Sequence, residues 1–121
     1  MIESPVSHVL VSRASLRDLS RQMGPEVCRQ FVGNYIDMWE GRYQRLVKSL
    51  DGGDYPGAMD VVLSIKISSH MAGAERLAGY AVLAQDMVGR TDIHGMQSLL
   101  KPMQECGEAT LASLRHLLDR M

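Results

Sequence analysis

Apolar side chains recur every three or four residues along most of the chain, which is the spacing of amphipathic helices. The strict apolar–polar alternation that is typical of a half-buried β-strand is missing. The pattern therefore predicts an all-α protein. Glycine, proline and capping residues divide it into successive helices with short connections, as in an antiparallel up-and-down helical bundle.

Two helices are expected in the first half of the chain. Ser15 is expected to cap a short helix, with Asp18 in the position of a capping box. The Gly-Pro pair at residues 24–25 ends this helix, because proline suits the first turn of a new helix. A second, longer helix is expected over residues 25–50, and the Gly-Gly turn at residues 52–53 stops it.

Three further helices are expected in the second half. Asp54 is a capping residue for a third helix over residues 55–71. A fourth amphipathic segment follows and ends at Gly89, and a Thr-Asp pair at residues 91–92 begins the last helix. Pro102 lies inside the last pattern, where it is expected to kink the helix or to split it in two.

The length and the patterning indicate one folded domain. Residues 1–13 are weakly patterned and are expected to form an N-terminal arm, in which residues 9–11 are apolar. Residues 14–121 are expected to form the bundle, a four-helix core with a short N-terminal helix.

Composition and charge exclude several function classes. The net charge is −1 and the basic residues are scattered, so nucleic acid and membrane surfaces are not expected partners. Cys28 and Cys106 lie far apart, without the spacing of a zinc site. No phosphate loop, paired carboxylates or Ser-His-Asp set is present, so neither an enzyme nor a cofactor is expected. A cytoplasmic location is the expectation, since the sequence contains no signal-peptide pattern.

Residues 54–77, DYPGAMDVVLSIKISSHMAGAERL, resemble the central motif of histidine-phosphotransfer (HPt) domains. That family has a small acidic turn, then Ala-His-x-Leu-Lys-Gly-Ser-Ser on a helix, then Gly-Ala and a leucine. The positions that correspond in this chain are Val62, Ile65, Lys66, Ser68, Ser69, Gly73, Ala74 and Leu77. The resemblance extends from about Ser15 to the C-terminus. It implies an HPt-like bundle in a two-component phosphorelay, with a receiver domain or a sensor kinase as partner.

Two departures from the motif bear on chemistry. Leu63 occupies the position of the phosphorylated histidine and has no nitrogen to carry a phosphoryl group. Ile67 replaces the glycine after the lysine, and its branched side chain is expected to obstruct the close approach of a receiver. The resemblance therefore implies a site with no catalytic residue.

The third helix is apolar on both sides. At 100° per residue, one face is small or apolar and suits the bundle core. Its members are Ala58, Val61, Val62, Ile65, Ser68, Ser69 and Ala72. The opposite stripe lies within about 60° of Leu63. Its members are Met59, Leu63, Lys66, Ile67 and His70. We interpret this stripe as a partner-binding surface. The competing accounts are that the N-terminal arm covers it, or that single exposed apolar residues are tolerated there.

The leading hypothesis is a non-phosphorylatable HPt-like domain that acts by protein–protein binding. A second hypothesis is active phosphotransfer through His70, which shares the stripe of Leu63 but lies about 10 Å further along the axis. The alternative interpretation of His70, without a functional role, is a solvated surface histidine. The corresponding interpretation of Lys66 is a solvated charge on the helix surface. A third hypothesis is a helical dimerisation module without a phosphorelay role, and a homodimer through the stripe is compatible with it.

Overall fold

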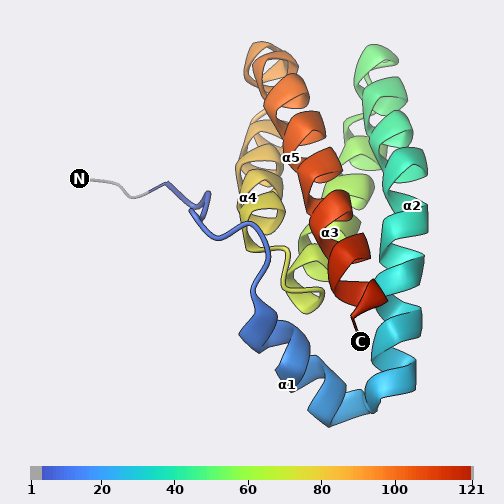
Figure 1. Cartoon of the computed structure of the whole chain (residues 1–121). Helices are drawn as coiled ribbons and strands as arrows, with labels where there is room; N and C mark the ends of the chain where they lie inside the picture. Colours follow the sequence, from blue (N-terminus) through green and yellow to red (C-terminus); the bar gives the residue numbers. More distant parts are fainter. Residues whose placement is uncertain (1–3, 121) are drawn as a thin grey trace.

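The computed structural model describes residues 4–120, so residues 1–3 of the expected arm and residue 121 of the expected bundle lie outside the described part. The described residues form five helices and no strand, which confirms the all-α prediction (Figure 1). The helices are α1 (Arg13–Met23), α2 (Pro25–Asp51), α3 (Tyr55–Met71), α4 (Glu75–Gly89) and α5 (Ile93–Asp119).

Helices α2, α3, α4 and α5 stand side by side as an antiparallel bundle (Figure 1). Each packs against the helix before and after it, and α5 closes the ring by packing on α2. Short α1 lies across the lower end of the bundle, against α2 and α3. This is the up-and-down architecture that the helix pattern and the short connections predict.

In the second half of the chain, the helices begin at the capping residues that the sequence predicts. The Asp54 side chain caps α3 by accepting a hydrogen bond from the backbone N–H of Gly57 at 2.9 Å. Asp92 caps α5 in the same way, accepting from Gly95 N–H at 2.9 Å. Each cap satisfies one of the backbone donors that the first turn of a helix leaves unpaired.

The predicted start of α1 is wrong by three residues. Ser12, not Ser15, is the cap, and its hydroxyl accepts a hydrogen bond from Ser15 N–H at 3.1 Å. The backbone N–H of Ser12 also donates to the carbonyl of Gly73 at 2.7 Å. Contact with the turn between α3 and α4 therefore sets where α1 begins, and the local pattern contains no sign of it.

Pro102 does not split α5, which runs unbroken from Ile93 to Asp119. A proline removes the hydrogen bond to the carbonyl four residues earlier, here that of Ser98. Both residues are exposed, so water can satisfy that carbonyl. Of the two expected outcomes, a kink or a split, the split is therefore wrong, because the proline lies on the solvent side.

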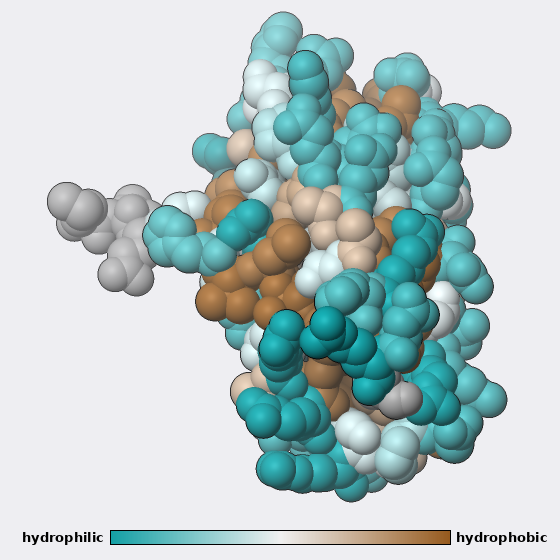
Figure 2. Space-filling model, viewed as in Figure 1, coloured by the Kyte–Doolittle hydropathy of each residue, from teal (hydrophilic) through white to brown (hydrophobic). Residues whose placement is uncertain are grey.

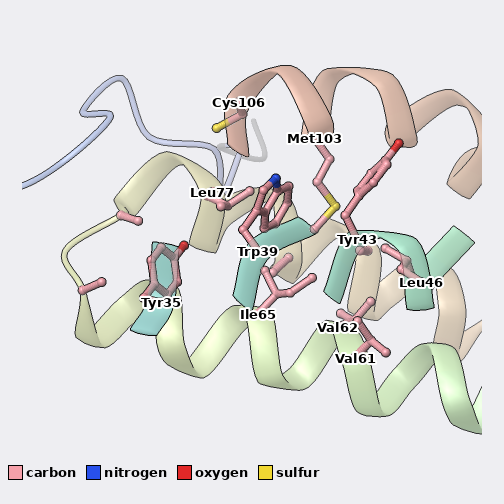
Figure 3. Close-up of a cluster of buried hydrophobic side chains, with 14 of the residues drawn as sticks. Tyr35, Trp39, Tyr43, Leu46, Val61, Val62, Ile65, Leu77, Met103 and Cys106 are labelled. Carbon is pink, nitrogen blue, oxygen red and sulfur yellow. The ribbon is translucent and has the colours of Figure 1, made fainter. Parts of the chain in front are cut away.

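The core is assembled from all four bundle helices (Figure 3). Its largest fully buried side chains include Leu46, Ile65, Leu77, Met103 and Leu114. Trp39 of α2 packs on α5 at Gly107, where a side chain would overlap the indole ring. The buried indole N–H has no hydrogen-bond partner among the described residues, so Trp39 is held by packing alone.

The contact between Trp39 and Gly107 generates a stability prediction. A Cβ at residue 107 would overlap the indole, so Gly107→Ala should destabilise the bundle by about 1–3 kcal/mol through overpacking. Gly41→Ala is the matched control, since no atom lies within 4 Å of its added methyl. That change should stabilise α2 by up to about 1 kcal/mol. Urea unfolding followed by circular dichroism measures both, and equal effects would contradict the packing argument.

Candidate functional site

The two faces of α3 are divided as the helical spacing predicts. The core side is fully or nearly fully buried, apart from the half-buried Ser68. On the opposite side, Met59, Leu63 and Lys66 are half-buried, whereas His70 is exposed and Ile67 is 58% exposed. The structure thus brings all five predicted site residues to one side of the helix.

Helix α4 extends this surface with residues that the sequence did not single out. Val82 is 42% exposed and shares a groove with Lys66, Ile67 and His70. A second hollow lies between Met59 and the part of α4 that includes Val82 and Gln85. We call the seven residues together the α3–α4 face: Met59, Leu63, Lys66, Ile67, His70, Val82 and Gln85.

The side chain of Lys66 forms a hydrogen bond within the protein, which corrects the interpretation that it is only a solvated helix charge. Its ammonium group donates a hydrogen bond to the side-chain oxygen of Gln85 at 2.8 Å. The bond joins α3 to α4 in the middle of the α3–α4 face. Within the described part of the chain Lys66 forms no ion pair, so its positive charge is available to an acidic partner.

Two serines attach the inner side of α3 to α2. The hydroxyl groups of Tyr35 and Ser69 are 2.5 Å apart and buried, and either one can be the donor. Arg42 donates to the Ser68 hydroxyl at 3.0 Å. The two serines correspond to a pair of small residues in the motif that the sequence resembles, but the motif does not predict their hydrogen bonds to α2. The bonds help to set the rotation of α3, and thereby the direction in which Leu63 points.

Burial also changes the acidity of this inner cluster. Desolvation raises the pKa of Tyr35 to about 12, although the hydrogen bond with Ser69 and the nearby charge of Arg42 oppose it. Desolvation lowers the pKa of Arg42, and the coulombic influence of Tyr35 opposes that shift. The cluster is structural, because it lies on the core side of α3 and away from the α3–α4 face.

The chemical capacity of the α3–α4 face is limited. The side chain of Leu63 is a hydrocarbon and cannot accept a phosphoryl group. His70 is the one imidazole on this face, and it lines the groove about one turn beyond Lys66. No group of three histidine, cysteine or carboxylate side chains that could hold a metal occurs among residues 4–120. No described helix has the length and apolarity needed to cross a membrane.

The described part of the N-terminal arm, from residue 4 on, borders the groove and does not cover Ile67. Arg76 of α4 donates to the backbone carbonyls of Ser7 and His8, at 3.1 and 2.5 Å. The arm backbone at Pro5 lies directly against Gly79, where a side chain would clash. This path follows the first half of α4 and leaves Ile67 largely exposed. The account in which the arm covers the stripe is therefore wrong for Ile67.

Comparison with protein-family models and with curated proteins finds no match. Among solved structures, the chain is similar to histidine-containing phosphotransfer protein B (HptB) from Pseudomonas aeruginosa PAO1. The TM-score is 0.86 at 21% sequence identity, over 95% of this chain and 99% of that chain. The likeness spans nearly the whole of both proteins and shows that they share a fold.

The Tyr35–Ser69 bond generates a prediction at two pH values. At pH 7, Tyr35→Phe should cost about 1–3 kcal/mol, because the buried Ser69 hydroxyl loses its partner. Unfolded tyrosine loses its proton near pH 10, whereas folded Tyr35 keeps it to about 12. Unfolding therefore releases a proton between these values, and the wild type loses stability as pH rises through this window.

The variant lacks this proton release. The difference in the free energy of unfolding between the wild type and Tyr35→Phe should therefore become smaller above pH 10, by at most about 1.4 kcal/mol per pH unit. Urea unfolding at pH 7 and pH 11 measures it. Tyr80→Phe is the control, because Tyr80 is half-buried and its hydroxyl forms no hydrogen bond in the described part of the chain. A deficit of Tyr35→Phe that stays constant with pH would contradict the argument.

Proposed function

We propose that this chain is an HPt-like domain of a two-component phosphorelay that binds a receiver domain or a sensor kinase without carrying phosphate. The proposal is supported by the fold that the chain shares with an HPt protein, together with Leu63 at the position where the motif resemblance places the phosphoacceptor. A protein that keeps the docking scaffold but lacks the acceptor nitrogen can occupy a partner without relaying a phosphoryl group. The proposed location is the cytoplasm, where such partners act.

The character of the α3–α4 face supports binding. Ile67 and Val82 expose apolar surface from two adjacent helices, and Lys66 adds a positive charge beside them. Neighbouring apolar side chains on a surface favour a protein contact, because a partner can remove them from water. A receiver domain suits this combination, since its phosphorylation site is acidic and would face Lys66.

The first prediction of this proposal is chemical inertness. Incubation with phosphorylated receivers from the organism of origin should leave the chain unlabelled, because Leu63 has no nitrogen. Radiolabel transfer followed by acid treatment measures this, since phosphohistidine is acid-labile. A catalytically competent HPt protein assayed with the same receivers is the positive control. Acid-labile phosphate on this chain would overturn the proposal.

Restoring the motif tests whether the scaffold itself is intact. Leu63→His alone should restore little transfer, because Ile67 still crowds the approach to the new imidazole. The double change Leu63→His with Ile67→Gly should transfer more, although glycine costs about 1 kcal/mol inside a helix. Circular dichroism must show that both variants are folded. Equal transfer by the two variants would refute the role given to Ile67.

A separate prediction concerns docking. Ile67→Glu places a charge in the middle of the α3–α4 face and should weaken receiver or kinase binding by at least about tenfold. Its thermal stability should change little, because Ile67 is 58% exposed. Met38→Glu on α2 is the matched control, since Met38 is 50% exposed and lies on another helix. Isothermal titration with each candidate partner measures the affinity.

The outcomes of this experiment are distinct. Unchanged binding in Ile67→Glu would contradict docking through the α3–α4 face. Sedimentation of the same variants tests the alternative of a homodimer, which pairs like residues across a two-fold axis. Self-association of the wild type that is lost in Ile67→Glu, with no affinity for any receiver or kinase, would favour the dimerisation module instead.

One observation favours a second candidate function, phosphotransfer through His70. Its imidazole is exposed and lines the same groove as Lys66, which lies between Leu63 and His70 along α3. An exposed imidazole is a competent nucleophile near neutral pH. Acid-labile label that disappears in His70→Ala, but persists in His94→Ala, would establish this function in place of the binding role.

A further inference from the structure

A second concave site lies at the opposite edge of α1, away from the α3–α4 face. It is formed by α1, the beginning of α2 and the end of α5, and has a volume of about 600 Å³. Its lining includes Arg13, Arg17, Arg29 and Arg120, together with Leu16 and Leu117. We call it the arginine pocket. Its volume is within the range of small-molecule sites in proteins, roughly 300–1,000 Å³.

The hollow exists because α1 packs on only part of the bundle. Helix α1 packs against α2 and α3, but within the described residues its backbone does not come close to that of α5. A gap therefore remains between α1 and the C-terminal end of α5. Figure 2 shows hydrophobic surface in this region with hydrophilic side chains around it. The apolar part of the lining comes from Leu16 and Leu117.

The charge of the pocket is unlike that of the whole protein. The chain has a net charge of −1, yet four of its ten arginines line this one hollow. Arg13, Arg17 and Arg120 form no ion pair within the described part of the chain. Arg29 donates to Glu26 at 2.7 Å. Residues of α1 and the end of α5 thus bring three arginines without an ion pair to one largely apolar hollow, and the fourth, Arg29, is paired with Glu26.

We propose that the arginine pocket binds a small organic phosphate whose remaining part is flat and apolar. Guanidinium groups bind phosphate oxygens through paired hydrogen bonds and also stack on planar rings. The leucines offer the apolar part of such a ligand a surface out of water. All the basic residues of the pocket are arginine and none is lysine, which favours a planar, phosphorylated ligand over a simple inorganic anion.

The pocket is independent of the proposed docking face. The side of α1 that carries Asp18 and Gln22 lines a hollow shared with His70. Arg13 and Arg17 belong to the other side of the same helix, toward the end of α5. The inference therefore does not rest on the proposed phosphorelay role, and each can fail without the other.

The experiment uses the full chain labelled with ¹⁵N and the probe 2-naphthyl phosphate, with inorganic phosphate and 2-naphthol as its separated parts. The naphthyl phosphate should shift amide signals at α1, the beginning of α2 and the end of α5. It should bind at least about tenfold more tightly than inorganic phosphate or 2-naphthol, since it contacts the arginines and the leucines of the pocket at once. Its affinity should fall with added salt, because the contacts are ionic.

A double variant tests the arginines. Arg13→Gln with Arg17→Gln should weaken naphthyl phosphate binding by at least about tenfold. Arg45→Gln with Arg115→Gln is the control, because it removes the same charge from exposed positions outside the pocket. Circular dichroism confirms that both are folded. Equal loss in the two variants, signal shifts located elsewhere, or naphthyl phosphate binding no better than its parts would each overturn the proposal.

Discussion

The packing of α3 between α2 and α4 is the constraint on which the rest of the structure depends. The helix is apolar on both sides, and a helix in a four-helix ring can bury only the side that faces the ring's centre. Its core side carries small side chains, Ala58 and Ser69 among them, that are fully buried. The Tyr35–Ser69 and Arg42–Ser68 hydrogen bonds then hold one rotation of α3 against α2. The remaining apolar side chains, with Ile67 the most exposed of them, must face outward.

The same constraint separates the fold from its chemistry. The core side of α3 contributes packing to the bundle, whereas Leu63 lies on the other side and is only half-buried. Replacing a residue there changes what the surface can do and leaves the ring of helices intact. This explains how a chain can share a fold with HptB at a TM-score of 0.86 with leucine at the position where the resemblance places the acceptor. Function is a property of the site and not of the bundle.

The outer surface divides into two regions of different character. The α3–α4 face combines exposed apolar side chains with one lysine held by Gln85. The arginine pocket combines an apolar interior with guanidinium groups from three helices. Helix α1 separates the two, because one of its sides lines the hollow next to His70 and the other lines the pocket. A short helix outside the four-helix ring thus determines much of the surface at this end of the molecule.

The sequence by itself determined the helices, most of their ends and the division of α3 into two faces. These features depend on interactions within a few residues, such as the caps at Asp54 and Asp92 and the spacing of apolar side chains. Only the tertiary structure decided the start of α1 at Ser12, the bond from Lys66 to Gln85 and the gathering of arginines from both ends of the chain. Each of these joins residues that are distant in sequence, and local periodicity contains no information about which distant residues meet. Packing of whole helices supplies that information, because it places side chains from separate segments within contact distance.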